Sequence, residues 1–259
     1  MHMPYDTLPR IAQDTALFLD FDGTLVELAA RPEAVVIPPT LTSTLAALYG
    51  QLGGALALVS GRRLSDLDSF LAPLQLPAAV EHGGQRRNAD GLVISAPATD
   101  LRAALQAAEG LLQRHPGLQL ERKNLALSLH YRHAPDLEDL CLQVMGDAVA
   151  RSPGLQLMHG KCVVDLKPVG VSKGTAIAAF MDEAPFAGRV PVFAGDDVTD
   201  EDGFEQVLRM GGHAIKVGPG PTLAKHRCDS VTQLAQWLLS ARAPERAPER
   251  ASGSERRHA

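Results

Sequence analysis

Two carboxylates stand where an apolar run ends, and their spacing suits metal-assisted chemistry. Residues 16–19 are apolar, and Asp20 and Asp22 follow them directly. On an extended strand alternate side chains share a face, so both carboxylates can point into one space as the strand ends. Two like charges held this close raise each other's pKa unless a cation or a donor lies between them. Such a pair alone is more often part of a turn or a helix cap. Together with Gly23-Thr24, the end of an apolar run and a second acidic cluster downstream, it favours metal-assisted chemistry.

Other apolar runs of the chain also end in polar groups. Runs 55–59, 78–80 and 190–194 are followed by Ser60, by Glu81 and His82, and by Asp196, Asp197 and Asp200. In open parallel sheets the binding crevice lies outside the carboxyl ends of the strands. A carboxylate cluster with no cysteine prefers a hard cation such as Mg²⁺. With Lys173 near a predicted helix start, these groups are those that phosphoryl transfer requires.

The roles can be divided by chemical need. A carboxylate can form an acyl phosphate, so Asp20 is the candidate nucleophile. Asp22 could protonate the leaving oxygen and then deprotonate water. Thr24 could hydrogen-bond near the phosphate, beside the sharp turn that Gly23 permits. Asp196 would complete the metal site, and Asp197 and Asp200 are either further metal support or acidic residues at the start of a helix.

The pattern of elements predicts an α/β fold whose parallel sheet positions these residues. A strand, a helix from about residue 39 and a second strand at 55–59 form a parallel βαβ unit. A hairpin is expected over 86–94. From 102 to 167 the order helix, two strands, helix, two strands is a complete α/β unit. We therefore expect a core of residues 1–101 and 168–240 with an inserted α/β domain at 102–167, and a disordered tail at 241–259.

Composition narrows the class of partner. Of 259 residues, 45% are hydrophobic and 21% are charged, and the formal net charge is −5. This mild acidity argues against nucleic acid or a membrane surface as the partner. The three cysteines form no C-x-x-C motif, and no secretory signal or membrane-spanning run is visible. We expect a cytoplasmic monomer that acts on a small molecule.

Four motifs resemble those of the haloacid dehalogenase-like phosphatases. They are Asp20-Phe21-Asp22-Gly23-Thr24, Ser60-Gly61-Arg62, Lys173-Gly174 and Gly195-Asp196-Asp197-Val198-Thr199-Asp200. The segments 81–83, 129–132, 160–168 and 195–202 are similar to those of the trehalose-6-phosphate phosphatase family. The resemblance covers residues 14–240. It implies a Rossmann-like core with an inserted cap domain and a Mg²⁺-dependent phosphatase that hydrolyses trehalose 6-phosphate through a phospho-aspartate.

The resemblance also implies a role for each matching residue. Asp20 would be phosphorylated and bind Mg²⁺, Asp22 would be the acid and base with its carbonyl on the metal, and Asp196 would be the third ligand. Ser60 and Lys173 would hold the phosphoryl group. The expected substrate contacts are Thr24, Arg62, His82, Lys123, Arg132, Lys161 and Asp165. The family usually has glutamate at the position of Asp165.

Two other functions remain open at this point. Another sugar-phosphate phosphatase, or a phosphomutase, of the same superfamily would use the same motifs. A phospho-accepting receiver module also places aspartates and a lysine at parallel strand ends. A receiver needs no inserted α/β domain, so the length of the chain argues against it.

Overall fold

The computed structural model describes residues 7–29, 31–160 and 162–242. In these ranges the strands form two sheets, one of eight strands and one of four. The larger sheet has the order β12-β11-β10-β1-β2-β3-β4-β5. Its strands are β1 (Thr15–Leu19), β2 (Leu56–Val59), β3 (Ala78–Val80), β4 (Gln85–Arg87), β5 (Val93–Ser95), β10 (Val190–Gly195), β11 (His213–Val217) and β12 (His226–Cys228).

Six neighbouring strands of this sheet, from β12 to β3, run parallel. The chain fills the sheet from β1 outward through β2 and β3, and later from β10 outward through β11 and β12. The order therefore reverses between β1 and β10, and such a switch point is where open α/β sheets bind ligands. At the carboxyl ends of β1 and β10, the amide of Asp20 donates a hydrogen bond to the carbonyl of Ala194, at 2.9 Å.

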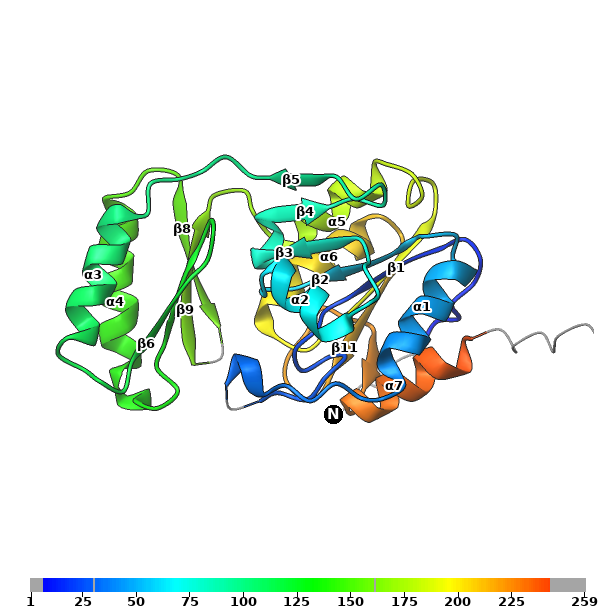
Figure 1. Cartoon of the computed structure of the whole chain (residues 1–259), viewed down its shortest axis with the longest axis horizontal. Coiled ribbons are helices and arrows are strands. Elements are labelled where there is room, and N and C mark those ends of the chain that lie inside the picture. The colour runs from blue at the N-terminus through cyan, green and yellow to red at the C-terminus, as the bar shows by residue number, and fades with distance from the viewer. Residues whose placement is uncertain (1–6, 30, 161, 243–259) are drawn as a thin grey trace, which may run out of the picture.

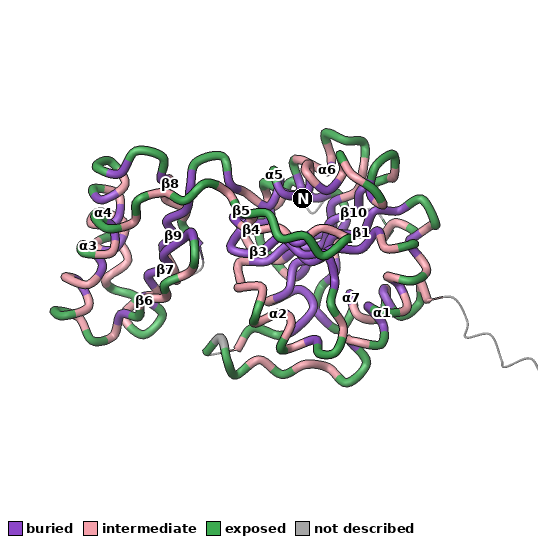
Figure 2. Tube along the Cα trace, turned by 45° about the horizontal axis from the view of Figure 1, so that its top comes forward, coloured by how far each residue is buried: buried purple, intermediate pink, exposed green. Residues whose placement is uncertain are grey.

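Helices cover both faces of the larger sheet, as Figures 1 and 2 show. Helices α5 (Lys173–Met181) and α6 (Glu201–Arg209) lie on one face, and α1 (Leu41–Gln51), α2 (Leu64–Leu71) and α7 (Val231–Ser240) lie on the other. The strands of the parallel part are buried almost throughout, as expected for a sheet covered on both sides. Six phenylalanines are among the largest fully buried side chains of the described residues, and the rings of Phe18, Phe180 and Phe186 contact one another.

The second sheet belongs to residues 102–168, which we call the second unit. It has the order β6-β7-β9-β8, with all neighbours antiparallel. Its elements are α3 (Arg102–Leu112), β6 (Gln119–Arg122), β7 (Leu127–His130), α4 (Glu138–Ala150), β8 (Leu155–Gly160) and β9 (Val163–Pro168). The two helices cover the outer face of this sheet, and the opposite face is turned toward the larger sheet (Figure 1). A separate cluster of buried side chains fills the space under α3 and α4.

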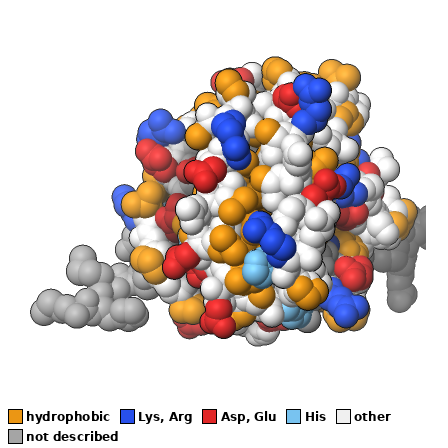
Figure 3. Space-filling model, turned by 90° about the vertical axis from the view of Figure 1, so that its left-hand side faces the viewer, with side chains coloured by type: hydrophobic (Ala, Val, Ile, Leu, Met, Phe, Trp, Pro, Cys, Tyr) orange, Lys and Arg blue, Asp and Glu red, His pale blue; other side chains and the backbone are white. Residues whose placement is uncertain are grey.

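The outer surface of the second unit mixes charges of both signs. Figure 3 looks onto this side, and acidic, basic and apolar side chains are interspersed on it. None of the described helices is long and apolar enough to span a bilayer. This face carries no broad surface of one charge.

The fold class predicted from the sequence is confirmed, with small differences in the elements. The hairpin expected at 86–94 is β4 and β5, which run antiparallel along the edge of the sheet. Strand β12 was not predicted, because His226, Arg227 and Cys228 lack the apolar run that marked its neighbours. The tail predicted to be disordered lies, from residue 243 onward, outside the described residues.

Candidate active site

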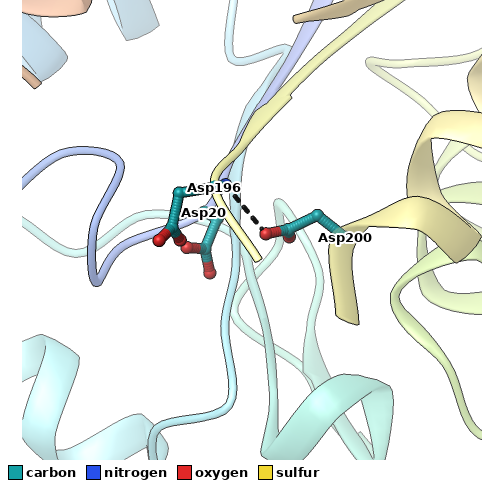
Figure 4. Close-up of side chains that lie close together, drawn as sticks. All are labelled: Asp20, Asp196 and Asp200. Carbon is teal, nitrogen blue, oxygen red and sulfur yellow. Dashed lines mark hydrogen bonds between the residues drawn. The ribbon is translucent and has the colours of Figure 1, made fainter. Parts of the chain in front are cut away.

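The two central strands deliver the first two carboxylates of the site. Asp20 follows β1 and Asp196 follows β10, and their side chains point toward one another in Figure 4. One carboxylate oxygen from each of Asp20, Asp196 and Asp200 lies within 4.8 Å of the others. The sequence pattern anticipated this convergence, since parallel strands present their carboxyl ends at one edge.

Gly23 is required by the geometry beside Asp196. Its φ of +77° lies in the left-handed region that favours glycine, and its amide closes a turn onto the carbonyl of Val26 at 2.8 Å. A Cβ at this position would lie 2.2 Å from Oδ2 of Asp196. The Asp196 carboxylate therefore packs directly on the backbone of the turn that follows Asp22.

Lys173 lies between two of the carboxylates. It is the first residue of α5, whose start is fixed by Ser172 and Thr175 in a reciprocal capping arrangement. Its ammonium donates to Oδ1 of Asp20 at 2.8 Å and to Oδ1 of Asp200 at 2.6 Å. Burial alone would lower the pKa of Lys173, but the two carboxylates outweigh it and raise that pKa, so the lysine stays charged.

Asp200 and Asp197 organise the loop after β10. The Oδ2 atom of Asp200 accepts hydrogen bonds from the amides of Asp196 at 3.0 Å and Asp197 at 2.9 Å, and Asp200 is fully buried. The side chain of Asp197 accepts from the amide of Val198 at 2.8 Å, at the start of a short 3₁₀ helix, Val198–Asp200. Both oxygens of Asp200 therefore have protein donors, and its part is to shape the loop.

The carboxylates repel one another in the absence of a cation. Burial raises the pKa of Asp196 to about 7, and the nearby charge of Asp200 adds to the effect. Burial also raises the pKa of Asp20, and Lys173 opposes this rise. One ammonium among three clustered aspartates leaves net negative charge in a buried place, so the donor set fits a hard divalent cation.

Arg62 holds the other carboxylate of the first motif. Its Nε and Nη2 atoms each lie 2.6 Å from an oxygen of Asp22, in a two-point contact. The guanidinium also lies over the ring of Phe70, with its carbon 4.9 Å from the ring centre. Arg62 was predicted to contact the substrate; it lines the cavity, and its guanidinium also pairs with Asp22.

Ser60 and His82 form the floor of the cavity beside Lys173. The hydroxyl of Ser60 accepts from the amide of Arg62 at 3.2 Å. The ring of His82 packs on Gly61, where an added Cβ would lie 2.6 Å from its Nε2. Burial lowers the pKa of His82 to about 3, although Asp165 opposes the shift, so the imidazole is neutral near pH 7.

A cavity of about 610 Å³ opens over these groups, and both units line it. Volumes of this order are typical of small-molecule sites. Eleven of the residues predicted from the sequence are part of its lining: Asp20, Asp22, Ser60, Arg62, His82, Lys123, Arg132, Asp165, Lys173, Asp196 and Asp197.

Asp165 faces the larger sheet from the second unit. It is 3% exposed, and it accepts a short hydrogen bond from Ser128, its partner across β7 and β9. Its Oδ2 atom lies 3.6 Å from Nε2 of His82. The shorter side chain at this position is therefore anchored by its neighbour on the sheet and directed toward the core.

Two of the predicted residues are outside the lining of this cavity, and a third is not among the described residues. Thr24 is fully buried and lines a separate small cavity between α1 and α7, so the expectation that its side chain meets substrate is wrong for this structure. Asp200 lies beneath the cavity and outside its lining, because its two oxygens are held by Lys173 and by the loop. Lys161 is outside the described residues.

Several polar side chains that line the cavity or contact its walls were not predicted from the sequence as site residues. Glu121, Ser128 and His130 line the cavity, and Glu121 lies 3.2 Å from His130 and 4.0 Å from Lys123. Strand alternation could have indicated Glu121. It lies two residues before the predicted contact Lys123, and alternate side chains of a strand share a face. Glu81 stood out in the sequence only as a polar residue at a strand end, and it contacts the second unit rather than the cavity.

Comparison with known proteins identifies the family. The model of the trehalose-phosphatase family matches residues 18–233. The chain is 42% identical over 240 residues to trehalose-6-phosphate phosphatase of Escherichia coli K12, covering 92% of this chain and 90% of that protein. It is 46% identical over 209 residues to a probable trehalose-phosphate phosphatase of Sinorhizobium fredii, covering 79% and 78%.

Solved structures share the fold. The C-terminal domain of trehalose-6-phosphate phosphatase from C. albicans superposes with a TM-score of 0.79 at 22% identity, over 88% of this chain and 92% of that one. A trehalose-6-phosphate phosphatase related protein gives 0.68 at 28% identity, over 86% and 95%. From the family model and the curated relatives together, the chain is a phosphatase that belongs to the trehalose-phosphatase family and has the haloacid dehalogenase-like fold.

Proposed function

We propose that this protein is a Mg²⁺-dependent phosphatase that hydrolyses trehalose 6-phosphate to trehalose and phosphate, as a step of trehalose biosynthesis. The observation that supports it most is the place of Asp20. Its carboxylate lies at the switch point of the sheet, between Lys173 and Asp196, at the base of a cavity lined by two units. The names of the curated relatives supply the substrate.

The reaction has two steps in this proposal. A carboxylate oxygen of Asp20 attacks phosphorus, the bond from phosphorus to the sugar oxygen breaks, and Asp22 gives its proton to that oxygen. Asp22 then takes a proton from water, the water oxygen attacks phosphorus, and the bond from phosphorus to Asp20 breaks. Lys173 and the hydroxyl of Ser60 hold the equatorial oxygens of the phosphoryl group through both steps.

The side chains of Asp20 and Asp196 and the backbone carbonyl of Asp22 would hold Mg²⁺. When bound, the ion neutralises charge on the phosphoryl oxygens and helps align them for in-line attack. The raised pKa values of Asp20 and Asp196 support this assignment, because a cation would relieve the repulsion that contributes to both shifts. Asp197 and Asp200 act as support for the loop that carries Asp196.

Residues 102–167 act as a cap domain over the phosphoryl site and recognise the sugar. Lys123, Arg132 and Asp165 are the proposed sugar contacts of this unit, and His82 and Arg62 complete them from the core. The expected contact from Lys161 remains part of the proposal. A polar lining of this kind suits the hydroxyl groups of a disaccharide, and closure over it excludes bulk water.

The cavity over Asp20 is lined by both units of this one chain, which supports a monomer as the active form. We propose a cytoplasmic monomer that needs no partner other than its small-molecule substrate.

Release of phosphate from a panel of sugar phosphates tests the substrate. We expect trehalose 6-phosphate to have the highest kcat/KM, well above glucose 6-phosphate and other hexose phosphates. A higher value for a monosaccharide phosphate would favour another sugar-phosphate phosphatase. EDTA should remove the activity and added Mg²⁺ should restore it. Undiminished turnover in EDTA would contradict the metal assignment.

A further inference from the structure

The turn after β3 joins the two units through the side chain of Glu81. This residue is 1% exposed, and its carboxylate accepts hydrogen bonds from two backbone amides of the second unit. The amide of Asn124 lies 3.1 Å from Oε1, and that of Leu125 lies 2.8 Å from Oε2. Amide hydrogen bonds to an ionised carboxylate are stronger than those between neutral groups. The contact therefore fixes how this part of the second unit lies on the larger sheet.

The backbone of the same turn is strained. Glu81 has a φ of 51° and His82 has a φ of 57°, which is the left-handed region in residues that are not glycine. Such conformations cost free energy and persist where surrounding contacts impose them. Here the amide of Glu81 donates to the carbonyl of Arg62 at 2.9 Å, and that of His82 donates to the carbonyl of Ser60 at 3.0 Å. The turn is thus tied to the loop that holds the phosphoryl contact Ser60.

In the second unit, the carboxylate of Glu81 binds the turn that includes Lys123. The amide of Lys123 donates to the carbonyl of Ala126 at 2.9 Å, so residues 123–126 form a closed turn between β6 and β7. Asn124 and Leu125 are its two central residues. The side chain of Lys123 is 7% exposed and lines the cavity, whereas the lining within the described residues does not include Glu81. Glu81 therefore reaches the cavity only through the turn it holds.

We propose that Glu81 is a positioning residue that docks turn 123–126 on the core and so sets the place of Lys123 at the sugar end of the cavity. The inference rests on the proposed function for its kinetic consequence, but not for the docking itself. Loss of the dock should weaken binding of the sugar in the ground state and the transition state alike. Chemistry at Asp20 should stay intact, because Lys173, Ser60 and Asp196 do not depend on the second unit for their contacts.

Amide hydrogen exchange resolved to single residues tests the dock directly. In the wild type the amides of Asn124 and Leu125 should both be protected. Glu81→Gln keeps the size of the side chain but turns an N–H donor toward one of the two amides, so exchange there should quicken by about tenfold or more. Glu183→Gln is the matched control, because that carboxylate pairs with Arg86 within the core. It should leave both amides as in the wild type.

Kinetics separates positioning from a general loss of structure. For trehalose 6-phosphate, Glu81→Gln should raise KM about tenfold and change kcat less than about twofold, as expected for lost uniform binding. For phenyl phosphate, which is too small to need the sugar contacts, both constants should stay within about twofold of the wild type. An equal loss of kcat on both substrates would overturn the proposal.

The two proposals can fail separately. Rapid exchange of both amides in the wild type would overturn the dock whatever the substrate is, and this measurement needs no variant to fold. If the wild type does not hydrolyse trehalose 6-phosphate, the proposed function fails. The dock is still supported if the two amides are protected in the wild type and lose that protection in Glu81→Gln. If the wild type hydrolyses trehalose 6-phosphate and Glu81→Gln matches it in both KM and exchange, the dock alone is refuted.

Discussion

Arg62 binds Asp22 through two hydrogen bonds of 2.6 Å, so the proposed acid and base is held by a guanidinium that itself lies over an aromatic ring. A planar guanidinium matches a carboxylate at two points, and the ring beneath limits its movement. Asp22 is therefore kept at one position beside the cavity. Arg62 acts on catalysis through Asp22 in this account, in addition to any contact with the sugar.

A double-mutant cycle measures this dependence. Arg62→Met should lower kcat by about tenfold or more, because Asp22 loses the partner that orients it. In the Asp22→Asn background the same change should have little further effect on kcat, since there is no acid left to orient. Steady-state kinetics of the four proteins gives the coupling. Additive losses would show that Arg62 and Asp22 act independently.

The close packing of Gly23 on Asp196 predicts a specific effect on the metal. Gly23→Ala would put a methyl group into the space of the Asp196 carboxylate, so the Mg²⁺ concentration for half-maximal activity should rise about tenfold or more. Gly170→Ala is the matched control, because Gly170 has a φ of +78° and open space around it. It should lose about 1 kcal/mol of stability from backbone strain and keep the Mg²⁺ dependence. Equal Mg²⁺ curves for the two variants would contradict the contact.

The buried imidazole of His82 predicts how stability depends on pH. Its pKa is about 3 in the folded protein and about 6.5 in an unfolded chain, so below pH 6.5 the unfolded state binds more protons. Stability should fall as pH drops from about 6.5 toward 3, by about 2 kcal/mol from this group at pH 5.

Denaturant unfolding from pH 7 to pH 5 checks this prediction. His82→Gln should lose less stability than the wild type over that range, because the glutamine takes up no proton. His133→Gln, which replaces an exposed imidazole, should follow the wild-type profile. Parallel profiles for wild type and His82→Gln would refute the prediction.

The local patterns of the sequence were enough for the fold and for the centre of the site. Apolar runs that end in polar residues located β1, β2, β3 and β10, and parallel order alone then brought Asp20 and Asp196 to one edge. Lys173 could be placed at the start of a helix, because Ser172 and Thr175 around it have the types and spacing of a helix cap.

Contacts between distant segments could not be predicted in the same way. Arg62 pairs with Asp22, which is 40 residues away in the sequence. Glu81 pairs with backbone amides, which every residue type except proline has, so the sequence does not indicate them. Thr24 belongs to the same motif as Asp22, but after the turn at Gly23 its side chain lies on the side away from the cavity, toward α1 and α7. Such positions depend on how the two units and the loops pack, which periodicity does not encode.

Turnover of trehalose 6-phosphate by Asp20→Asn at saturating Mg²⁺ tests the proposed nucleophile most directly. Asparagine keeps the size of the side chain but removes the charged oxygen that attacks phosphorus. Release of phosphate should fall by at least about a thousandfold, while the circular dichroism spectrum stays that of the wild type. A folded Asp20→Asn variant that keeps turnover within about tenfold of the wild type would contradict the phospho-aspartate mechanism.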